Sequence, residues 1–179
     1  MTLRLEKDGA IARLLIDRPD QRNAFDLAMW ESMPRLLADV VSDRGIRLLE
    51  VRSATGATFS AGADIKEMVA NSDDRHWREI NQAEINRAQH ALARVAVPTV
   101  AFIEGDCIGM GCGLALACDI RVATEKARFG ITPAKLGLVY PLHDTKLLMD
   151  LVGPGMAKTM LFTGAMIDAA RALDCGLVE

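Results

Sequence analysis

Two segments rich in small residues have the composition needed to present free backbone N–H groups to a ligand. The first is Thr58-Phe-Ser-Ala-Gly-Ala-Asp-Ile-Lys-Glu-Met68, and the second contains the glycine-rich turn Ile108-Gly-Met-Gly-Cys-Gly113. In both, small residues precede an expected helix, whose first N–H groups lack intrahelical partners and lie at its positive end. Two such donors converging from separate loops form an oxyanion hole. Either segment alone is more typical of plain packing.

The elements that would hold these segments alternate between strands and helices along residues 1–179. Asp8-Gly9 is a strong hairpin signal, and Asp26 is the expected cap of a helix in which Pro34 predicts a kink or a late start. The repeated order strand, strand, helix indicates one α/β domain with crossover connections. The expected strands are 3–6, 11–17, 46–52, 99–103 and 119–123. The expected helices are 26–41, a short one from 64, one from Asp73 or Asp74 to about 94, 113–117, 145–151, 154–162 and 168–174. Residues 105–113 are expected to be a loop, residues 129–140 irregular, and residues 175–179 the start of another strand.

The composition is that of a globular protein, since half of the 179 residues are hydrophobic and a quarter are charged. The net charge of −3 argues against a general nucleic-acid surface. The longest apolar stretches, 95–103 and 108–118, are too short to span a bilayer, and no signal-peptide pattern begins the chain. The four cysteines form no CxxC pair and no metal-ligand spacing. We therefore expect no metal and no membrane contact, and we expect buried thiols in a reducing cytoplasm.

Together the two segments resemble the signatures of the enoyl-CoA hydratase/isomerase (crotonase) superfamily. Residues 59–68 match the first signature, residues 108–123 match the second, and Arg18-Pro-Asp-Gln-Arg-Asn-Ala24 resembles an early CoA-contacting loop. Residues 126–130, 136–137 and 162–164 are similar to later landmarks of the family.

The resemblance implies the crotonase (ClpP-like) spiral, with two roughly perpendicular sheets and helices outside them. Family members generally carry further C-terminal helices that complete the site and build trimers or dimers of trimers. We therefore expect that helical region to be missing after Glu179. If the full-length chain is longer, we expect it to form a homotrimer or a hexamer.

The resemblance also implies a role in fatty acid metabolism and a set of residues that would contact an acyl-CoA. The backbone N–H groups of Ala63 and Met110 would hold the thioester oxygen, although many members have glycine in place of Met110. CoA is part of the substrate, so no separate cofactor is expected. Arg22 and Lys66 would meet the CoA phosphates, but either one alone is typical of a solvated surface charge. The full set that would contact CoA is Gln21, Arg22, Ala24, Ala61, Asp64, Ile65 and Lys66.

The chain departs from the family where hydratases carry two glutamates. Water addition needs one base and one acid, and the aligned positions hold Gly113 and Pro133. Tyr140, the only tyrosine, follows Thr132-Pro-Ala in a way that resembles a decarboxylase branch acting on malonyl-type CoA esters. That branch usually has a histidine where Ala63 stands.

Other ionisable residues near the second signature could supply an acid or a base. His143-Asp144 is one candidate pair, although Asp144 is more typical of a helix N-cap. Asp106 is a weaker candidate, Glu104 is expected to be structural, and His76 and His90 are expected at the surface.

Three functions remain open from the sequence. The first is an acyl-CoA lyase or isomerase of hydratase type that stabilises a thioester enolate and uses reassigned acid/base groups. The second is a decarboxylase of a malonyl-type CoA ester. The third is a CoA-binding protein without efficient catalysis.

Overall fold

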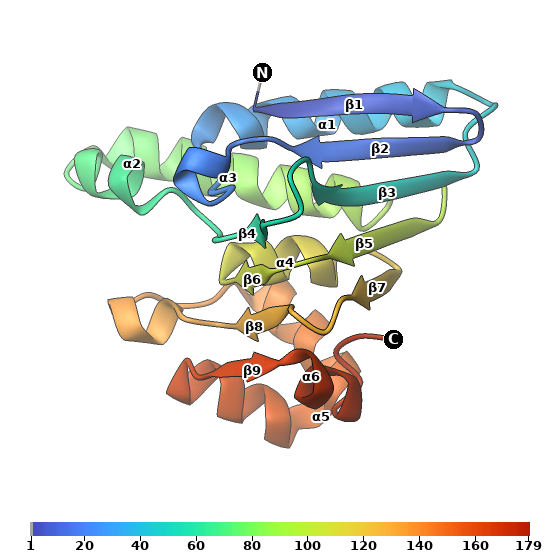
Figure 1. The fold of residues 1–179 in the computed structure, drawn as a ribbon. Coiled ribbons are helices and arrows are strands. Elements are labelled where there is room, and N and C mark those ends of the chain that lie inside the picture. The colour runs from blue at the N-terminus through green and yellow to red at the C-terminus, as the bar shows by residue number, and fades with distance from the viewer. Residues whose placement is uncertain (1) are drawn as a thin grey trace.

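The computed structural model describes residues 2–179 as two sheets that lie beside a group of helices (Figure 1). One sheet has five strands in the order β1-β2-β3-β5-β7, and the other has four in the order β4-β6-β8-β9. The colour runs from blue to red down the molecule in Figure 1, because each turn of the chain stacks on the preceding one. The predicted α/β fold with repeated crossovers is therefore confirmed.

The five-stranded sheet begins with the predicted hairpin. Strands β1 (Leu3–Asp8) and β2 (Ile11–Ile16) pair antiparallel, with Asp8 opposite Ile11, and Gly9 in the turn adopts a φ of +58°. Strands β3 (Leu48–Ser53), β5 (Thr99–Ile103) and β7 (Ile120–Ala123) add in parallel. Parallel neighbours require crossover connections, and α1 and α3 provide two of them.

The four-stranded sheet is built from strands of three residues each, none of which was predicted from the sequence. They are β4 (Thr58–Ser60), β6 (Asp106–Ile108), β8 (Arg128–Gly130) and β9 (Met166–Asp168). Residues 105–113, expected to be a loop, thus contain a strand, and residues 129–140 contain part of β8 and the 3-10 turn η2 (Pro133–Leu136). Strand β6 lies between β4 and β8, which brings both signature segments into one sheet.

Aspartates cap four of the helices through their side chains, because an Asp carboxylate accepts the N–H groups left free in the first turn. Asp26 caps α1 (Leu27–Ser42) as predicted, and Asp74, one of the two predicted candidates, caps α3 (Arg75–Leu92). Asp64 caps α2 (Ile65–Ala70) and Asp168 caps α6 (Ala169–Asp174), and neither cap was predicted. Helix α1 runs through Pro34 from Leu27, so the late start is wrong. Another 3-10 turn, η1 (Pro19–Gln21), precedes α1.

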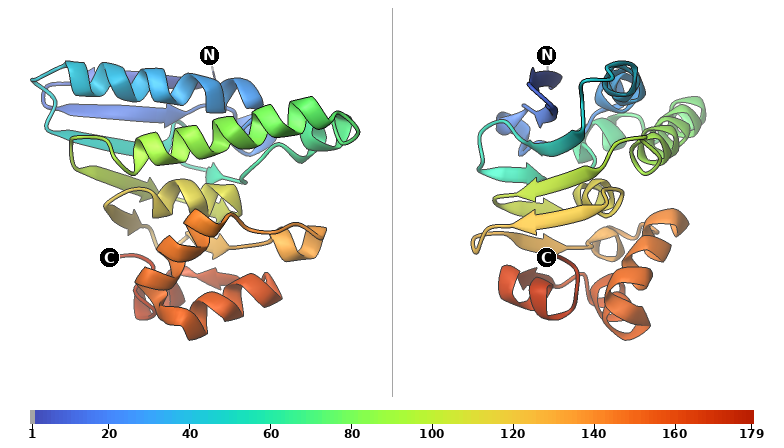
Figure 2. Two further views of the ribbon diagram at one scale, coloured as in Figure 1. Left: turned by 180° about the vertical axis from the view of Figure 1, so that it is seen from behind. Right: turned by 90° about the vertical axis from the view of Figure 1, so that its right-hand side faces the viewer.

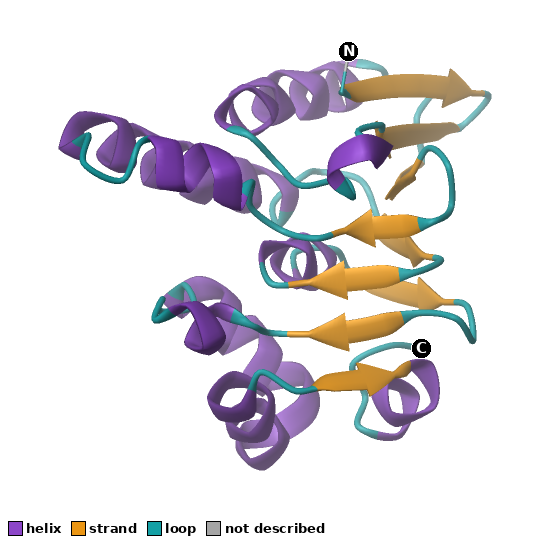
Figure 3. Ribbon diagram, turned by 60° about the vertical axis from the view of Figure 1, so that its left-hand side comes forward, coloured by secondary structure: helices purple, strands orange, loops and turns teal. Residues whose placement is uncertain are grey.

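Helix α4 (Met110–Leu116) begins three residues earlier than predicted, and α5 (Leu142–Thr163) also begins three residues early and breaks at Gly153. Helices α1, α3, α4 and α5 lie on the same face of the strands (Figures 2 and 3). Trp30, Phe25, Phe59 and Phe129 are among the largest fully buried side chains of the core. The last residues form no strand. Instead Glu179 pairs with the buried Arg121 at 2.9 Å.

Candidate active site

The two signature segments meet through backbone contacts that tolerate only glycine. Gly62 has a φ of +94°, and a Cβ built on it would lie 2.9 Å from the Met110 nitrogen and 2.8 Å from the Ile108 carbonyl oxygen. A Cβ on Gly111 would overlap the carbonyl oxygen of Ser60. Gly109 turns the chain with a φ of 56° directly before α4. The N-terminus of α4 therefore lies against the backbone of residues 60–62.

Within residues 2–179, each of the two segments has one backbone N–H group beside this contact that makes no hydrogen bond. The isolated bridge between Phe25 and Ala63 uses the N–H groups of Phe25 and Asp64, so the Ala63 N–H makes no hydrogen bond within residues 2–179. Met110 is the first residue of α4, and its N–H likewise has no acceptor in the described chain. Both residues line the same cavity. Two main-chain donors without a partner in residues 2–179 therefore lie at one cavity.

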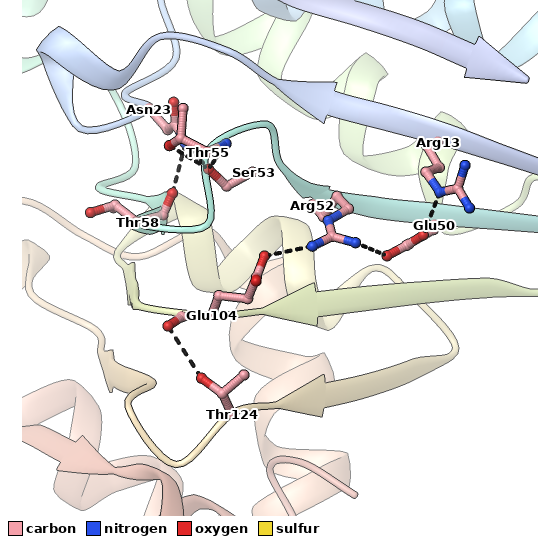
Figure 4. Close-up of polar contacts among 9 residues, drawn as sticks. All are labelled: Arg13, Asn23, Glu50, Arg52, Ser53, Thr55, Thr58, Glu104 and Thr124. Carbon is pink, nitrogen blue, oxygen red and sulfur yellow. Dashed lines mark hydrogen bonds and ion pairs between the residues drawn. The ribbon is translucent and has the colours of Figure 1, made fainter.

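A buried asparagine that the sequence analysis did not single out fixes the first of these segments. The Asn23 side chain donates to Ser53 Oγ at 2.9 Å and to the Thr58 carbonyl at 2.6 Å (Figure 4). The backbone carbonyl of Asn23 accepts from Ser60 Oγ at 2.8 Å, and Ser60 Oγ in turn accepts the Gly62 N–H at 3.1 Å. A buried polar residue with a positive φ of 57° is the local signal of this role.

Glu104 has the structural role that the sequence predicted. It accepts from Arg52 at 2.8 Å, and Arg52 also pairs with Glu50 of its own strand, which pairs in turn with Arg13 (Figure 4). The chain of ion pairs crosses β2, β3 and the end of β5, and it leaves Glu104 outside the cavity lining.

Replacing Gly111 with alanine should destabilise the protein by about 1–3 kcal/mol, since the new methyl group overlaps backbone rather than a movable side chain. Alanine normally favours a helix over glycine by roughly 0.5–1 kcal/mol, so the expected sign is opposite to the propensity. Urea unfolding measures the difference. Gly155→Ala is the matched control, because its Cβ would meet nothing within 4 Å. A Gly111→Ala variant as stable as the parent would refute the close contact.

The cavity in front of the two donors has a volume of about 230 Å³ and a mostly apolar lining. Ala61, Ala63 and Ile65 form one wall, and Pro133, Leu138 and Val139 form another. The second wall is open to solvent, and Val139 is 94% exposed. A neighbouring hollow of about 470 Å³ shares Ile65 and Leu138 and continues between α2 and α3. The two hollows together form an elongated, mostly apolar groove.

The residues expected to contact CoA differ in their exposure and in their distance from the cavity. Ala61 and Ile65 line the cavity, and Arg22 and Lys66 are exposed. Asp64 is buried. Burial acts against the ionised form, but hydrogen bonds from Arg18 at 2.7 Å and from the Glu67 N–H lower its pKa overall. Of the remaining two, Ala24 is buried and Gln21 is half-buried. Asp64 and Ala24 therefore shape the loop, since neither lines the cavity.

Asp106 does not reach the cavity and is held by two arginines. Its carboxylate accepts from Arg22 at 2.7 Å and from Arg128 at 2.8 Å. Tyr140 is also absent from the cavity lining. It is 6% exposed, and its hydroxyl donates to the Gly109 carbonyl at 3.2 Å. Burial and the nearby Asp144 raise the pKa of Tyr140 well above its usual value. Tyr140 supports the turn that presents the Met110 N–H.

The two positions that the resemblance aligns with the hydratase glutamates lie in different surroundings. Pro133 lines the cavity. A Cβ on Gly113 would lie 2.5 Å from Asp144 Oδ2 and 2.5 Å from Gln89 Nε2, so these two groups fill the space beside Gly113. Gln89 donates to Asp144 at 2.9 Å, and Asp144 is fully buried. The expectation that Asp144 caps a helix is wrong, because α5 begins at Leu142 with Pro141 as its N-cap and Asp144 points inward.

Burial raises the pKa of Asp144 to about 6, while the Gln89 hydrogen bond and His90 act in the opposite direction. The folded protein therefore holds a proton that the unfolded chain releases between pH 3.8 and about 6. Over that window the free energy of unfolding falls as pH rises. The rise of the Asp144 pKa to about 6 lowers the free energy of unfolding by up to about 3 kcal/mol at pH 7.

Asp144→Asn should therefore be more stable than the parent at pH 7 by about 1–3 kcal/mol, because the amide carries no buried charge and still accepts from Gln89. The gain should vanish at pH 4, where the parent carboxyl group is protonated. Urea unfolding of both proteins between pH 4 and 8 tests this. A variant less stable than the parent at pH 7 would contradict the buried, ionisable carboxyl group.

The cysteines agree with the expectation of buried thiols. Cys107, Cys112 and Cys118 are buried and Cys175 is partly buried, all unpaired. Burial raises the pKa of Cys118 to about 12 and that of Cys107 well above its usual value, so both are neutral thiols at pH 7. Of the histidines expected at the surface, His76 and His90 are exposed.

Comparisons with known proteins agree with this geometry. A sequence model of the family described as enoyl-CoA hydratase/isomerase matches residues 6–179. A crystal structure of an enoyl-CoA hydratase/isomerase family protein from Hyphomonas neptunium superposes with a TM-score of 0.96 at 38% identity, covering 99% of this chain and 68% of that one. The chain belongs to the enoyl-CoA hydratase/isomerase family.

Curated relatives are similar over nearly all of this chain but are longer. The short-chain-enoyl-CoA hydratase of Clostridium acetobutylicum is 34% identical across 98% of this chain and 66% of its own length. The mouse enoyl-CoA hydratase domain-containing protein 2, mitochondrial, is 34% identical across 94% of this chain and 56% of its own length. The chain thus spans between about half and two thirds of these relatives. Within residues 2–179, no helix has the length and apolar character required to cross a membrane.

Proposed function

We propose that this chain binds an acyl-CoA thioester and stabilises its enolate between the N–H groups of Ala63 and Met110. The main support is the pair of free donors that Gly62 and Gly111 hold together at an apolar cavity. An enolate oxygen carries the negative charge that two preorganised N–H groups stabilise best in a site shielded from water. The long cavity suits the pantetheine arm and the acyl chain.

The missing glutamates favour proton-transfer chemistry over water addition. Hydration needs one group to activate water and another to deliver a proton, and Gly113 and Pro133 can do neither. Tyr140 donates to a backbone carbonyl outside the cavity lining, so nothing specific favours the decarboxylase alternative. A mass-spectrometric turnover screen over a panel of acyl-CoA thioesters tests the proposal. Recovery of every thioester unchanged would leave only CoA binding, and released CO₂ would indicate the decarboxylase.

The CoA phosphates should bind near Arg22 and Lys66, both exposed beside the first signature. Removing both cations should weaken acyl-CoA binding about 10- to 100-fold, since each charge-assisted hydrogen bond contributes roughly 1.5–3 kcal/mol before solvent screening. Calorimetric titration of the Arg22→Ala, Lys66→Ala double variant measures this. Lys158→Ala on α5 is the control for loss of a surface lysine. Unchanged affinity in the double variant would overturn the phosphate placement.

A further inference from the structure

Polar side chains on α3 interrupt the apolar lining of the groove that runs from the cavity to the hollow between α2 and α3. Asn81 lines both the cavity and the hollow, whereas Arg78 lines the hollow but not the cavity. Ala63 and Met110 line the cavity but not the hollow. Along its length the groove therefore presents the two main-chain donors, then an amide, then a guanidinium.

The amide of Asn81 is buried and has no partner in the protein. Asn81 is 7% exposed, and its side chain makes no hydrogen bond within residues 2–179, although the neighbouring Gln82 donates to Asn86. Buried polar side chains nearly always have a hydrogen-bond partner. Because Asn81 lies in the wall of both hollows, its donor and its acceptor are available to a group that enters the groove.

Arg78 adds an unpaired positive charge to the same part of the groove. It is exposed and forms no ion pair in the described chain, whereas Arg75 on the same helix pairs with Glu79 at 2.8 Å. Among residues 2–179, no aspartate or glutamate lines the hollow. Arg78 precedes Asn81 by three residues, so the two occupy neighbouring positions on one face of α3. An anionic group in the hollow would meet a free guanidinium and a free amide together.

The hollow lies on the acyl side of the proposed thioester site. None of residues 18–24 lines it, and Arg22 is held instead by Asp106 on β6 at 2.7 Å. With the CoA phosphates beside Arg22 and the thioester oxygen between Ala63 and Met110, the part of the ligand that remains to enter the hollow is the acyl chain.

We propose that Arg78 and Asn81 determine the specificity of this site, and that the acyl chain of its substrate ends in a carboxylate. This inference rests on the proposed function. A planar guanidinium can donate two parallel N–H groups to a carboxylate, and the Asn81 amide supplies a further donor. An alkyl chain would fill the apolar part of the groove but leave both polar groups without a partner. The substrate class is thus the CoA monothioester of a dicarboxylic acid.

The probes are succinyl-, adipoyl- and suberoyl-CoA, each paired with the alkanoyl-CoA of the same chain length, so that the members of a pair differ only at the terminal carbon. None has a carbon–carbon double bond, so calorimetric titration measures binding alone. In at least one pair we expect the carboxylate to strengthen binding about 10- to 100-fold. The ratio should fall at high salt, because Arg78 is exposed and salt screens exposed charges.

Arg78→Gln should remove this preference and leave the binding of the alkanoyl-CoA unchanged. Asn81→Leu should reduce the preference about tenfold, since it removes one hydrogen bond to the charged group. Arg75→Gln is the matched control, because it removes an arginine of the same helix that does not line the hollow. Circular dichroism establishes that each variant is folded.

Trp77 provides a second readout, because it lines the hollow while Trp30, the other tryptophan, is buried in the core. The preferred dicarboxylic thioester should change the tryptophan emission more than free CoA does. Trp77→Phe should abolish that difference. A role of Arg78 in folding alone would not produce a ligand-dependent change at Trp77.

Equal affinities within every pair would overturn the inference, although binding of the thioesters would leave the proposed function standing. A preference that survives Arg78→Gln, or that Arg75→Gln lowers equally, would also overturn it. Weaker binding of free CoA to Arg78→Gln would assign Arg78 to the CoA phosphates and refute its role at the acyl chain. A protein that binds no acyl-CoA would overturn the proposed function and this inference together.

Discussion

The purified protein should hydrate but-2-enoyl-CoA at close to the uncatalysed rate. A missing acid or base costs about 10²–10⁴ in rate, and both hydratase positions are affected, since Gly113 has no side chain and Pro133 has no proton to transfer. The oxyanion donors still polarise the thioester, but they cannot deliver hydroxide to one carbon and a proton to the next.

Loss of enoyl absorbance measures this rate, with the short-chain-enoyl-CoA hydratase of Clostridium acetobutylicum assayed beside it as a positive control. Tyr140→Phe, Asp106→Asn and Asp144→Asn variants follow if hydration is brisk. Hydration that one of these changes abolishes would identify a replacement acid or base. Hydration that survives all three would show that the catalytic positions have been assigned wrongly.

Met110→Pro should reduce turnover about 10²- to 10³-fold, which is the usual cost of losing one oxyanion-hole donor. The structure makes this test unusually specific. Met110 is the first residue of α4, so a proline there removes no intrahelical hydrogen bond. Met110→Gly keeps the N–H and removes only the side chain, so it should retain most activity.

Circular dichroism and urea unfolding establish that the proline variant is folded before its rate is interpreted. A folded Met110→Pro variant with normal turnover would rule out the main-chain donor. An equal loss in Met110→Gly would instead assign the effect to the methionine side chain, which is half-buried at the cavity.

Local chemistry accounts for the parts of the fold that the sequence predicted. Asp8-Gly9, Asp26 and Asp74 each act within a few residues of their own position, and each formed the predicted turn or cap. Strands β6, β8 and β9 have three residues each. Three residues are too few to show an alternation of polar and apolar side chains, so their pairing depends on segments far away in the chain.

The candidate site was also predictable only in part. The resemblance of the two signature segments to the family implied that Ala63 and Met110 lie together, and both residues line one cavity. The inward position of Asp144 could not be predicted from its neighbours, since its partner Gln89 lies 55 residues earlier. A usable signal was nevertheless present, because a glycine at position 113 of a buried helix leaves space that a side chain from another helix can fill.

The placement of the oxyanion donors on the main chain has an evolutionary consequence. A substitution at Ala63 or Met110 changes a side chain but leaves the N–H in place, so charge stabilisation survives most point mutations at those two codons. Proton transfer depends on side chains and is therefore lost or gained one substitution at a time. A lineage with this architecture can keep its ability to form an enolate while its acid/base groups change. Selection can thus change the reaction while the ancestral binding of thioesters is inherited intact.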